Sequence, residues 1–207
     1  MKTVVALTDP EDIDAALESG ADFIELRIDL FSAEPAACCG RCTVPLIVTL
    51  RSSAEGGMFS GSPEEWWEQV EPWCQYAAYI DTEQRFSAYA RSIRAHGPQV
   101  IASLHLPDTP DTPALHAHET ALRAYGDLPK IITTPRSNED LLRFLGFTTR
   151  AAANGPLCTG TMGPDLRFGR VLTGLFGSEM VYCHFGTPTA AGQYHITEVQ
   201  EIMRLLV

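Results

Sequence analysis

The sequence predicts a single (β/α)8 barrel, an α/β fold in which eight parallel strands alternate with eight helices. Strand-like apolar segments alternate with helical segments from one end of the chain to the other, and eight such strands are recognisable. The length of 207 residues lies near the lower limit for a closed barrel and argues against a second domain. We therefore expect one barrel domain over residues 1–207.

The expected strands are short, apolar and bounded by turn-forming residues. They span residues 3–8, 22–29, 45–51, 77–83, 99–105, 129–134, 156–162 and 179–185. An open, doubly wound sheet is the runner-up. However, Leu7-Thr-Asp-Pro10 leads from the first strand directly into a helix, without a glycine-rich phosphate loop. We therefore favour the barrel, compact and without an N-terminal extension.

Several expected helices have clear start signals. Asp9-Pro10 supplies an N-cap and a first helical residue, and both Ser62-Pro-Glu-Glu65 and Ser137-Asn-Glu-Asp140 have the capping-box pattern. The helix after Ser137 is expected to stop at Gly146. Further helices are expected at 84–96, 112–124 and about 195–206, while 166–176 stays undecided.

Two loops, Ser52–Gly61 and Gly186–Tyr194, combine small, turn-forming residues. Loops of this composition at the edge of a barrel often close over a binding site. Both are therefore candidates for mobile covers.

The charge balance narrows the classes of partner. A formal net charge of -11 would repel nucleic acid and anionic membrane surfaces, so we expect neither as a partner. The chain has no apolar run of the ~18 residues that a membrane-spanning helix needs, and its start lacks a signal-peptide pattern. The expected location is the cytoplasm.

The six cysteines do not form a recognisable metal-binding pattern. Cys39 and Cys42 have CxxC spacing, and Cys38 adjoins them, but a structural zinc site usually needs a second pair of ligands. The other cysteines lie singly in apolar segments, where a small buried side chain is the default interpretation. We therefore expect neither a metal nor another cofactor, although a redox role for the CxxC pair stays open.

Charged residues alternate with apolar ones in the second expected strand. Ile24, Leu26, Ile28 and Leu30 share one parity, and Glu25, Arg27 and Asp29 share the other. Successive side chains point to opposite faces of a strand, so the three charged groups face the barrel interior or its rim. Interior charges are expensive unless paired, which leaves a structural ion-pair network or a functional site, and the second is favoured.

Lys130 is the most unusual residue because the only other lysine is Lys2, whereas there are 13 arginines. It lies in an apolar strand, and burial lowers the pKa of a lysine and makes its amine nucleophilic, as Schiff-base chemistry requires. A lysine that extends its amine to water from a strand end is the plain alternative. His105 ends the preceding strand, and strand ends at this edge of a barrel carry catalytic groups.

Ordered motifs along nearly the whole chain resemble the type I 3-dehydroquinate dehydratases. They are Glu25-Leu-Arg-Ile-Asp29, Arg51-Ser-Ser-Ala-Glu55-Gly-Gly, Ile80-Asp-Thr-Glu83, Ser103-Leu-His105, Pro129-Lys-Ile131, Met162 with Arg170 and Phe176-Gly-Ser178, and Thr189-Ala-Ala-Gly-Gln193. The resemblance implies that Lys130 forms an imine with 3-dehydroquinate. His105 would act as general base and then general acid, and Glu55 would orient His105.

The resemblance also implies a substrate site and an assembly. Arg170, Thr189 and Gln193 would hold the substrate carboxylate, while Glu25, Arg27 and Arg51 would bind the ring hydroxyls. Met162 would pack against the carbocycle. Arginines and burial would keep the pKa of Lys130 below that of a free lysine. A homodimer is expected, since dimers are common in the family. The chain departs from the family pattern after His105, where Leu-Pro-Asp follows, and at Thr189, where serine is common.

Two other functions share part of this pattern. Another Schiff-base barrel lyase would need Lys130 but not the late Thr189–Gln193 segment. A catalytically inactive barrel that serves as a binding module would not form a covalent adduct at Lys130.

Overall fold

The computed structural model describes residues 1–206 and contains an eight-stranded parallel sheet wound into a nearly closed barrel. Strand order follows chain order, and β8 returns to pair with β1. The strands are β1 Lys2–Leu7, β2 Phe23–Arg27, β3 Leu46–Thr49, β4 Tyr79–Glu83, β5 Gln99–His105, β6 Leu128–Thr133, β7 Cys158–Thr161 and β8 Met180–His184. The predicted (β/α)8 barrel is confirmed, and the open doubly wound sheet is wrong.

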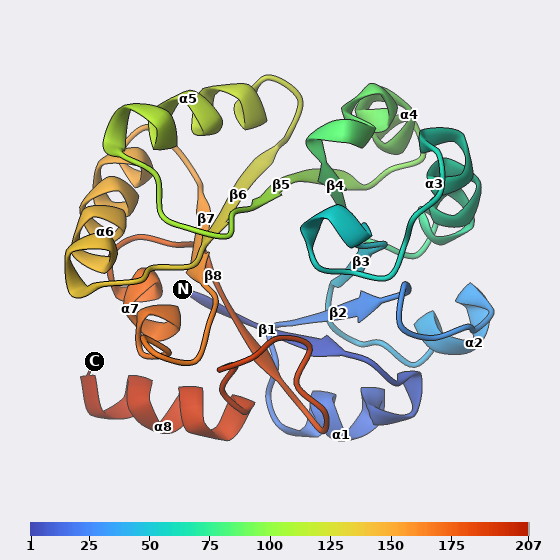
Figure 1. Ribbon diagram of the computed structural model, residues 1–207. Helices are drawn as coiled ribbons and strands as arrows, with labels where there is room; N and C mark the ends of the chain where they lie inside the picture. Colours follow the sequence, from blue (N-terminus) through green and yellow to red (C-terminus); the bar gives the residue numbers. More distant parts are fainter. Residues whose placement is uncertain (207) are drawn as a thin grey trace.

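Eight α-helices surround the strands in chain order (Figure 1). They are α1 Ile13–Glu18, α2 Pro35–Cys39, α3 Pro63–Val70, α4 Ala90–Ala95, α5 Thr112–Arg123, α6 Asn138–Ala152, α7 Gly169–Leu175 and α8 Ile196–Leu206. Short 3-10 helices precede α1 and α4, and another carries Glu55. The segment 166–176, undecided from sequence, contains α7. Within residues 1–206, no helix has the length and apolar character needed to cross a membrane.

Two of the predicted N-terminal signals act as expected: Ser62 and Glu65 form a reciprocal capping box at α3, and the Asp9 side chain caps the 3-10 helix that begins at Pro10. At α6 only half of the predicted capping box forms: the Ser137 hydroxyl accepts a hydrogen bond from the Asp140 backbone N–H, but the Asp140 carboxylate accepts from the Arg136 backbone N–H. The predicted stop of α6 at Gly146 is wrong, since the helix continues to Ala152. Phe147 and Ala151 are fully buried, and their burial outweighs the ~1 kcal/mol that an interior glycine costs a helix.

The predicted strand over residues 22–29 is too long. β2 ends at Arg27, and Leu30 is 39% exposed instead of packing against the helices. The chain turns there, with the Leu30 backbone N–H donating to the Arg27 carbonyl. The parity argument holds inside the strand, where Ile24 and Leu26 are fully buried among core residues.

The interior of the barrel has an apolar floor and a polar upper half. An apolar cluster that includes Ile47, Ile101 and Met180 fills the amino-terminal part, with Phe23 and Tyr79 packed against it. Two residues further along the same strands, the inward side chains become polar or charged: Glu25, Thr49, Asp81 and Ser103, with Lys130 beside them. The period-two alternation therefore directs polar groups to one end, the carboxyl end of the strands.

The seam between β7 and β8 closes without a regular strand ladder. The Glu179 backbone N–H donates to the Leu157 carbonyl at 2.9 Å. The Ser178 hydroxyl accepts from the Thr159 backbone N–H at 2.9 Å and lies 2.9–3.0 Å from the carbonyl oxygens of Thr159 and Met180. A buried side chain thus replaces part of the missing ladder.

Replacing Ser178 by alanine is expected to destabilise the fold by about 1–3 kcal/mol, because the buried Thr159 N–H would lose its acceptor. Urea unfolding followed by circular dichroism measures the change. Ser32→Ala is the control, since Ser32 is exposed and makes no side-chain hydrogen bond within residues 1–206. Equal unfolding midpoints for the two variants would contradict this role for Ser178.

Candidate active site

A cavity of about 330 Å³ opens at the carboxyl ends of the strands. Every residue predicted for the site from the sequence lines this cavity. They are Lys130, His105, Glu55, Glu25, Arg27, Arg51, Met162, Arg170, Thr189 and Gln193. Both glycine-containing loops contribute, with Ala54 and Gly56 from one and Ala190 from the other. The cavity therefore collects residues that are up to 168 positions apart, from Glu25 to Gln193.

Lys130 is buried on β6, with its side chain only 4% exposed. Its ammonium nitrogen, Nζ, lies 2.9 Å from Asp81 Oδ2 and 3.7 Å from Glu25 Oε1. Arginines were expected around this amine, but the nearest charges are the carboxylates of Asp81 and Glu25, so that expectation is wrong. Lys130 is therefore held at a defined place in the cavity wall and is not directed to bulk solvent.

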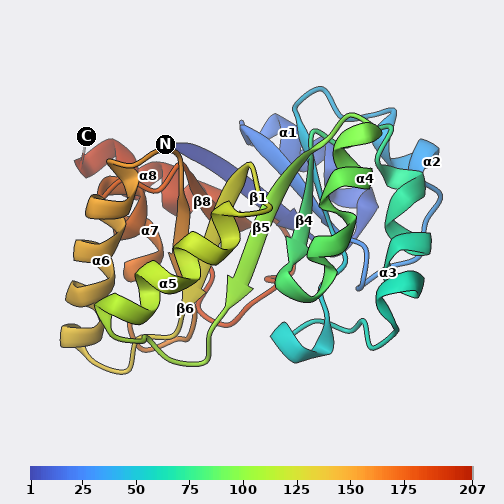
Figure 2. The same ribbon diagram turned by 90° about the horizontal axis from the view of Figure 1, so that it is seen from above.

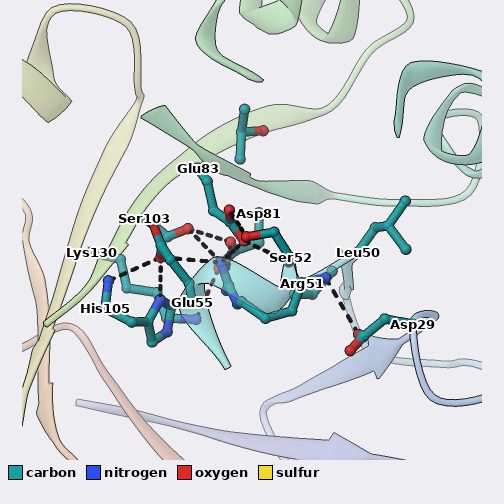
Figure 3. Close-up of polar contacts among 12 residues, drawn as sticks. Asp29, Leu50, Arg51, Ser52, Glu55, Asp81, Glu83, Ser103, His105 and Lys130 are labelled. Atoms are coloured by element: carbon teal, nitrogen blue, oxygen red, sulfur yellow. Dashed lines mark hydrogen bonds and ion pairs between the residues drawn. The ribbon is translucent and has the colours of Figure 1, made fainter. Parts of the chain in front are cut away.

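Asp81 joins Lys130 to Arg51 (Figure 3). Its Oδ1 accepts hydrogen bonds from Arg51 Nη2 at 2.8 Å and from the Ser103 hydroxyl at 2.5 Å, while Oδ2 binds Lys130. Burial alone would raise the pKa of Asp81, but Arg51 and Lys130 together hold that pKa well below its ordinary value. The carboxylate stays charged because two cations face it.

The same arginine is fixed from its other side by Glu83. Arg51 Nη1 donates to Glu83 Oε1 at 3.0 Å, and Glu83 Oε2 accepts from the Ser52 hydroxyl. Burial disfavours the charge of Arg51, yet the surrounding carboxylates raise its pKa above the ordinary value. Such a desolvated ion network is stable only when all of its partners are present.

His105 is oriented by Glu55, which comes from the loop after β3. Glu55 Oε2 lies 2.8 Å from His105 Nδ1 and also accepts the His105 backbone N–H at 3.0 Å. This contact favours the tautomer with the proton on Nδ1 and the lone pair on Nε2. No group among residues 1–206 is hydrogen-bonded to Nε2, so that nitrogen is free to act as a base.

The charges of this pair are set by burial. Burial lowers the pKa of His105 well below 6.5, and the nearby cations Arg51 and Lys130 lower it further. Burial raises the pKa of Glu55 to about 7, with Glu83 and Asp81 adding to the rise and Arg51 opposing it. At neutral pH the imidazole is therefore uncharged, as a general base must be.

The loop that carries Glu55 is folded tightly onto the end of β3. Gly56 has a φ of 85°, which favours glycine, and a Cβ at Gly57 would lie 2.1 Å from the Arg51 carbonyl oxygen. The Gly57 and Phe59 backbone N–H groups donate to the Ser52 and Arg51 carbonyls. The two adjacent glycines therefore allow the carboxylate to return over the strand end.

On the opposite side of the cavity, Thr189, Gln193 and Arg170 lie together. Gln193 Oε1 accepts from both the backbone N–H and the hydroxyl of Thr189, at 2.9 and 3.0 Å. Arg170 Nη2 donates to the Ala191 carbonyl at 2.8 Å, whereas its buried Nε has no partner in the described part of the chain. Burial and the neighbouring Arg167 lower the pKa of Arg170 to about 10. Arg170 lines the cavity, and the planar, charged donors of a guanidinium suit an anionic ligand.

Several contacts of the site were not predicted. Asp81 and Ser103 belong to motifs noted in the sequence, but their contacts with Arg51 and Lys130 cross between strands and leave no local signal. Tyr182 was not predicted as a site residue. The alternation of inward and outward side chains along its apolar strand could have placed it in the barrel interior. Asp29, beyond the end of β2, pairs with Arg27 at the rim at 2.7 Å.

The cysteines form no second centre within the described residues. All six are free thiols, and only Cys42 is not fully buried. Burial raises the pKa of Cys39 to about 12 and of Cys42 to about 11, which disfavours the reactive thiolate. Across residues 1–206, no group of three or more His, Cys, Asp or Glu side chains has an arrangement that could hold a metal ion.

Fold and cavity together define the class of this protein: it is a (β/α)8-barrel enzyme whose cavity, at the carboxyl ends of the strands, is lined by the histidine that ends β5 and by a lysine of the adjacent strand β6. The chain matches the family described as Type I 3-dehydroquinase over residues 6–207. It therefore belongs to the type I 3-dehydroquinase family.

Curated relatives agree with this assignment, and a solved structure agrees with the fold. A 3-dehydroquinate dehydratase from Methanoregula boonei is 42% identical over 210 residues, with both chains covered completely. One from Archaeoglobus fulgidus is 32% identical, again with complete coverage of both chains. The crystal structure of 3-dehydroquinate dehydratase from Geobacillus kaustophilus HTA426 has a TM-score of 0.92 at 23% identity, covering 99% of this chain and 90% of that chain.

The Glu55–His105 pair makes kcat/KM sensitive to pH near 7. As the pH falls through about 7, Glu55 takes up a proton and loses the charge that orients His105, so kcat/KM should fall. Glu55→Gln should lower the rate by roughly tenfold or more. It should also remove the fall in kcat/KM at low pH, because glutamine does not titrate. Initial rates across pH 5–9 measure both effects.

Glu68→Gln is the matched control, since Glu68 is exposed. It should keep the wild-type rate and profile. If kcat/KM of Glu55→Gln still fell as the pH dropped through about 7, another group would be the source of that fall.

Proposed function

We propose that this chain dehydrates 3-dehydroquinate to 3-dehydroshikimate through a Schiff base at Lys130, as a hydro-lyase of the shikimate pathway in aromatic amino acid biosynthesis. The single observation that carries the proposal is a buried lysine amine in one cavity with an uncharged, oriented histidine. Family membership and relatives named 3-dehydroquinate dehydratase support the substrate.

In the proposed reaction, the Lys130 amine attacks the C3 ketone, and loss of water gives a protonated imine. His105 then removes a proton from C2, and the electron pair of that C–H bond moves into the imine to give an enamine. The enamine returns its electrons as the C1 hydroxyl departs with a proton from His105. Hydrolysis of the product imine releases 3-dehydroshikimate and restores the amine. Every step uses side chains alone.

Register and hydrogen bonding support these roles. β6 pairs Lys130 with Ser103, two residues before His105 on β5, so the amine and the imidazole lie on adjacent strands. Glu55 holds the Nδ1 proton and leaves Nε2 for the substrate. A base and a nucleophile placed this close can act on neighbouring carbons of one ring.

The remaining cavity residues would bind the other substrate groups. Arg170, with Thr189 and Gln193, would hold the carboxylate, which the charged guanidinium of Arg170 in the cavity lining supports. Glu25, Arg27 and Arg51 would face the ring hydroxyls, and Met162 would pack against the carbocycle. Arg51 already binds Asp81 and Glu83 through both terminal nitrogens, so we expect it to act mainly by shaping the pocket.

Borohydride reduction in the presence of 3-dehydroquinate tests the covalent step. The wild-type chain should gain a stable adduct on Lys130, located by peptide mass spectrometry. Lys130→Ala should abolish the adduct and reduce turnover by several orders of magnitude, whereas Lys2→Ala should change neither, because Lys2 is exposed.

His105→Ala should still give the Lys130 adduct but should lower kcat by roughly 10²–10⁴-fold, the usual contribution of a general base. His118→Ala is the control on a helix outside the cavity. Near-wild-type turnover in His105→Ala would show that His105 is not the general base. If the wild-type fold were intact but neither the adduct nor dehydration were observed, the proposed function would be contradicted and a binding module would be favoured. If Lys130 formed an adduct with another ketone but not with 3-dehydroquinate, a different lyase would be favoured.

We further propose that the protein forms a homodimer. Helices α7 and α8 are neighbours (Figure 2), and exposed apolar side chains occur at both: Phe176, directly after α7, is 43% exposed and Leu205, on α8, is 69% exposed. We expect these side chains to take part in the interface, since exposed apolar surface often marks one. A cytoplasmic location remains a prediction of the sequence.

Light scattering after size exclusion should give about twice the 22.6 kDa mass of one chain. Leu205→Glu should shift the mass to that of a single chain, because it places a charge on the proposed interface. Leu142→Glu, at the other end of the barrel on α6, is the control and should remain dimeric. A wild-type mass of one chain at all concentrations would contradict the dimer.

A further inference from the structure

The ring of Tyr182 lies directly beneath the reacting nitrogen. Tyr182 is on β8, where it pairs with Val4 of β1, and it lines the cavity. Nζ of Lys130 is 4.0 Å from the centre of the Tyr182 ring, well inside the ~6 Å range of a cation–π contact. Tyr182 has no part in the reaction proposed above.

The other partners of Nζ depend on its hydrogens. An ammonium group has three N–H bonds, and here they face Asp81 Oδ2 at 2.9 Å and Glu25 Oε1 at 3.7 Å. When Nζ becomes a protonated imine it keeps the positive charge but retains a single N–H bond. Only Asp81 is within hydrogen-bond distance of Nζ, and the imine nitrogen can donate to one acceptor at most.

An aromatic face attracts a cation through its quadrupole and needs no N–H bond. The contact with Tyr182 can therefore persist while Lys130 changes from ammonium to imine. We propose that the Tyr182 ring is the electrostatic support of the Lys130 imine, stabilising its positive charge when the nitrogen has one N–H bond left instead of three. This inference rests on the Schiff-base chemistry proposed above.

The aromatic ring, and not the hydroxyl, carries this role. The Tyr182 hydroxyl is buried and has no hydrogen-bond partner among residues 1–206. Burial raises the pKa of Tyr182 well above 10, and the nearby Glu25 raises it further, so the phenol stays uncharged. Phenylalanine at this position should therefore support the imine as well as tyrosine does.

The test measures the equilibrium constant for imine formation. Each variant is brought to equilibrium with 3-dehydroshikimate over a range of concentrations, the imine is reduced with borohydride, and the Lys130 adduct is quantified by mass spectrometry. Tyr182→Phe should stay within about twofold of wild type. Tyr182→Leu should form the imine roughly 30-fold less well, equivalent to about 2 kcal/mol at 1.36 kcal/mol per tenfold.

A fluorinated series separates the quadrupole from packing, in case leucine disturbs the fold. Phenylalanine, 4-fluoro-, 3,5-difluoro- and pentafluorophenylalanine at position 182 have similar shapes, but each fluorine weakens the negative face of the ring. The logarithm of the imine constant should fall steadily along the series, while the thermal unfolding midpoints remain within a few degrees. A merely structural residue would not produce this trend.

The two proposals fail in different ways. If wild type gave no Lys130 adduct, the Schiff-base function itself would be wrong. If wild type gave the adduct but the fluorinated series had a constant imine equilibrium, only the role of Tyr182 would be overturned. A 30-fold loss in Tyr182→Phe would likewise overturn it, by assigning the effect to the hydroxyl.

Discussion

The buried carboxylate of Asp81 is the interaction on which the rest of the site depends. It binds Arg51 through one oxygen and Lys130 through the other, so it links β3, β4 and β6 across the barrel. Without it, two cations would lie close together in a desolvated interior, at a cost of several kcal/mol. The position of the amine, the fixed arginine and the polar upper half of the barrel all follow from this one charge.

Arg51 extends the same constraint to the proton-transfer pair. Its guanidinium lies 3.8 Å from Glu55, and its backbone carbonyl accepts the Phe59 N–H that closes the loop. The loop geometry in turn brings Glu55 to His105. Lys130 and His105, the proposed nucleophile and base, are thus held by one connected set of charges, so a change at either residue affects the electrostatics of the other.

The fold was predictable because its signals are periodic and local. Eight apolar segments alternated with capped helices, and the parity of Glu25 and Arg27 placed charges inside the barrel. Contacts between strands were harder to predict from the sequence. Lys130 reaches Asp81 past Ser103, and that proximity depends on the stagger of the strands and on the small side chain between them. Local signals also misplaced the end of α6, because tertiary burial of Phe147 outweighed the helix-breaking tendency of Gly146.

Apolar side chains close the amino-terminal end of the barrel interior, and the cavity opens at the carboxyl ends of the strands. Phe23, Tyr79 and Met180 belong to or pack against the cluster that fills the amino-terminal end, below the cavity. In the proposed reaction, imine formation would expel one water molecule, elimination would produce another, and hydrolysis would require one. The apolar floor would direct this water toward the opening through which the six-membered ring enters and leaves. Product departure and solvent entry would then share one opening.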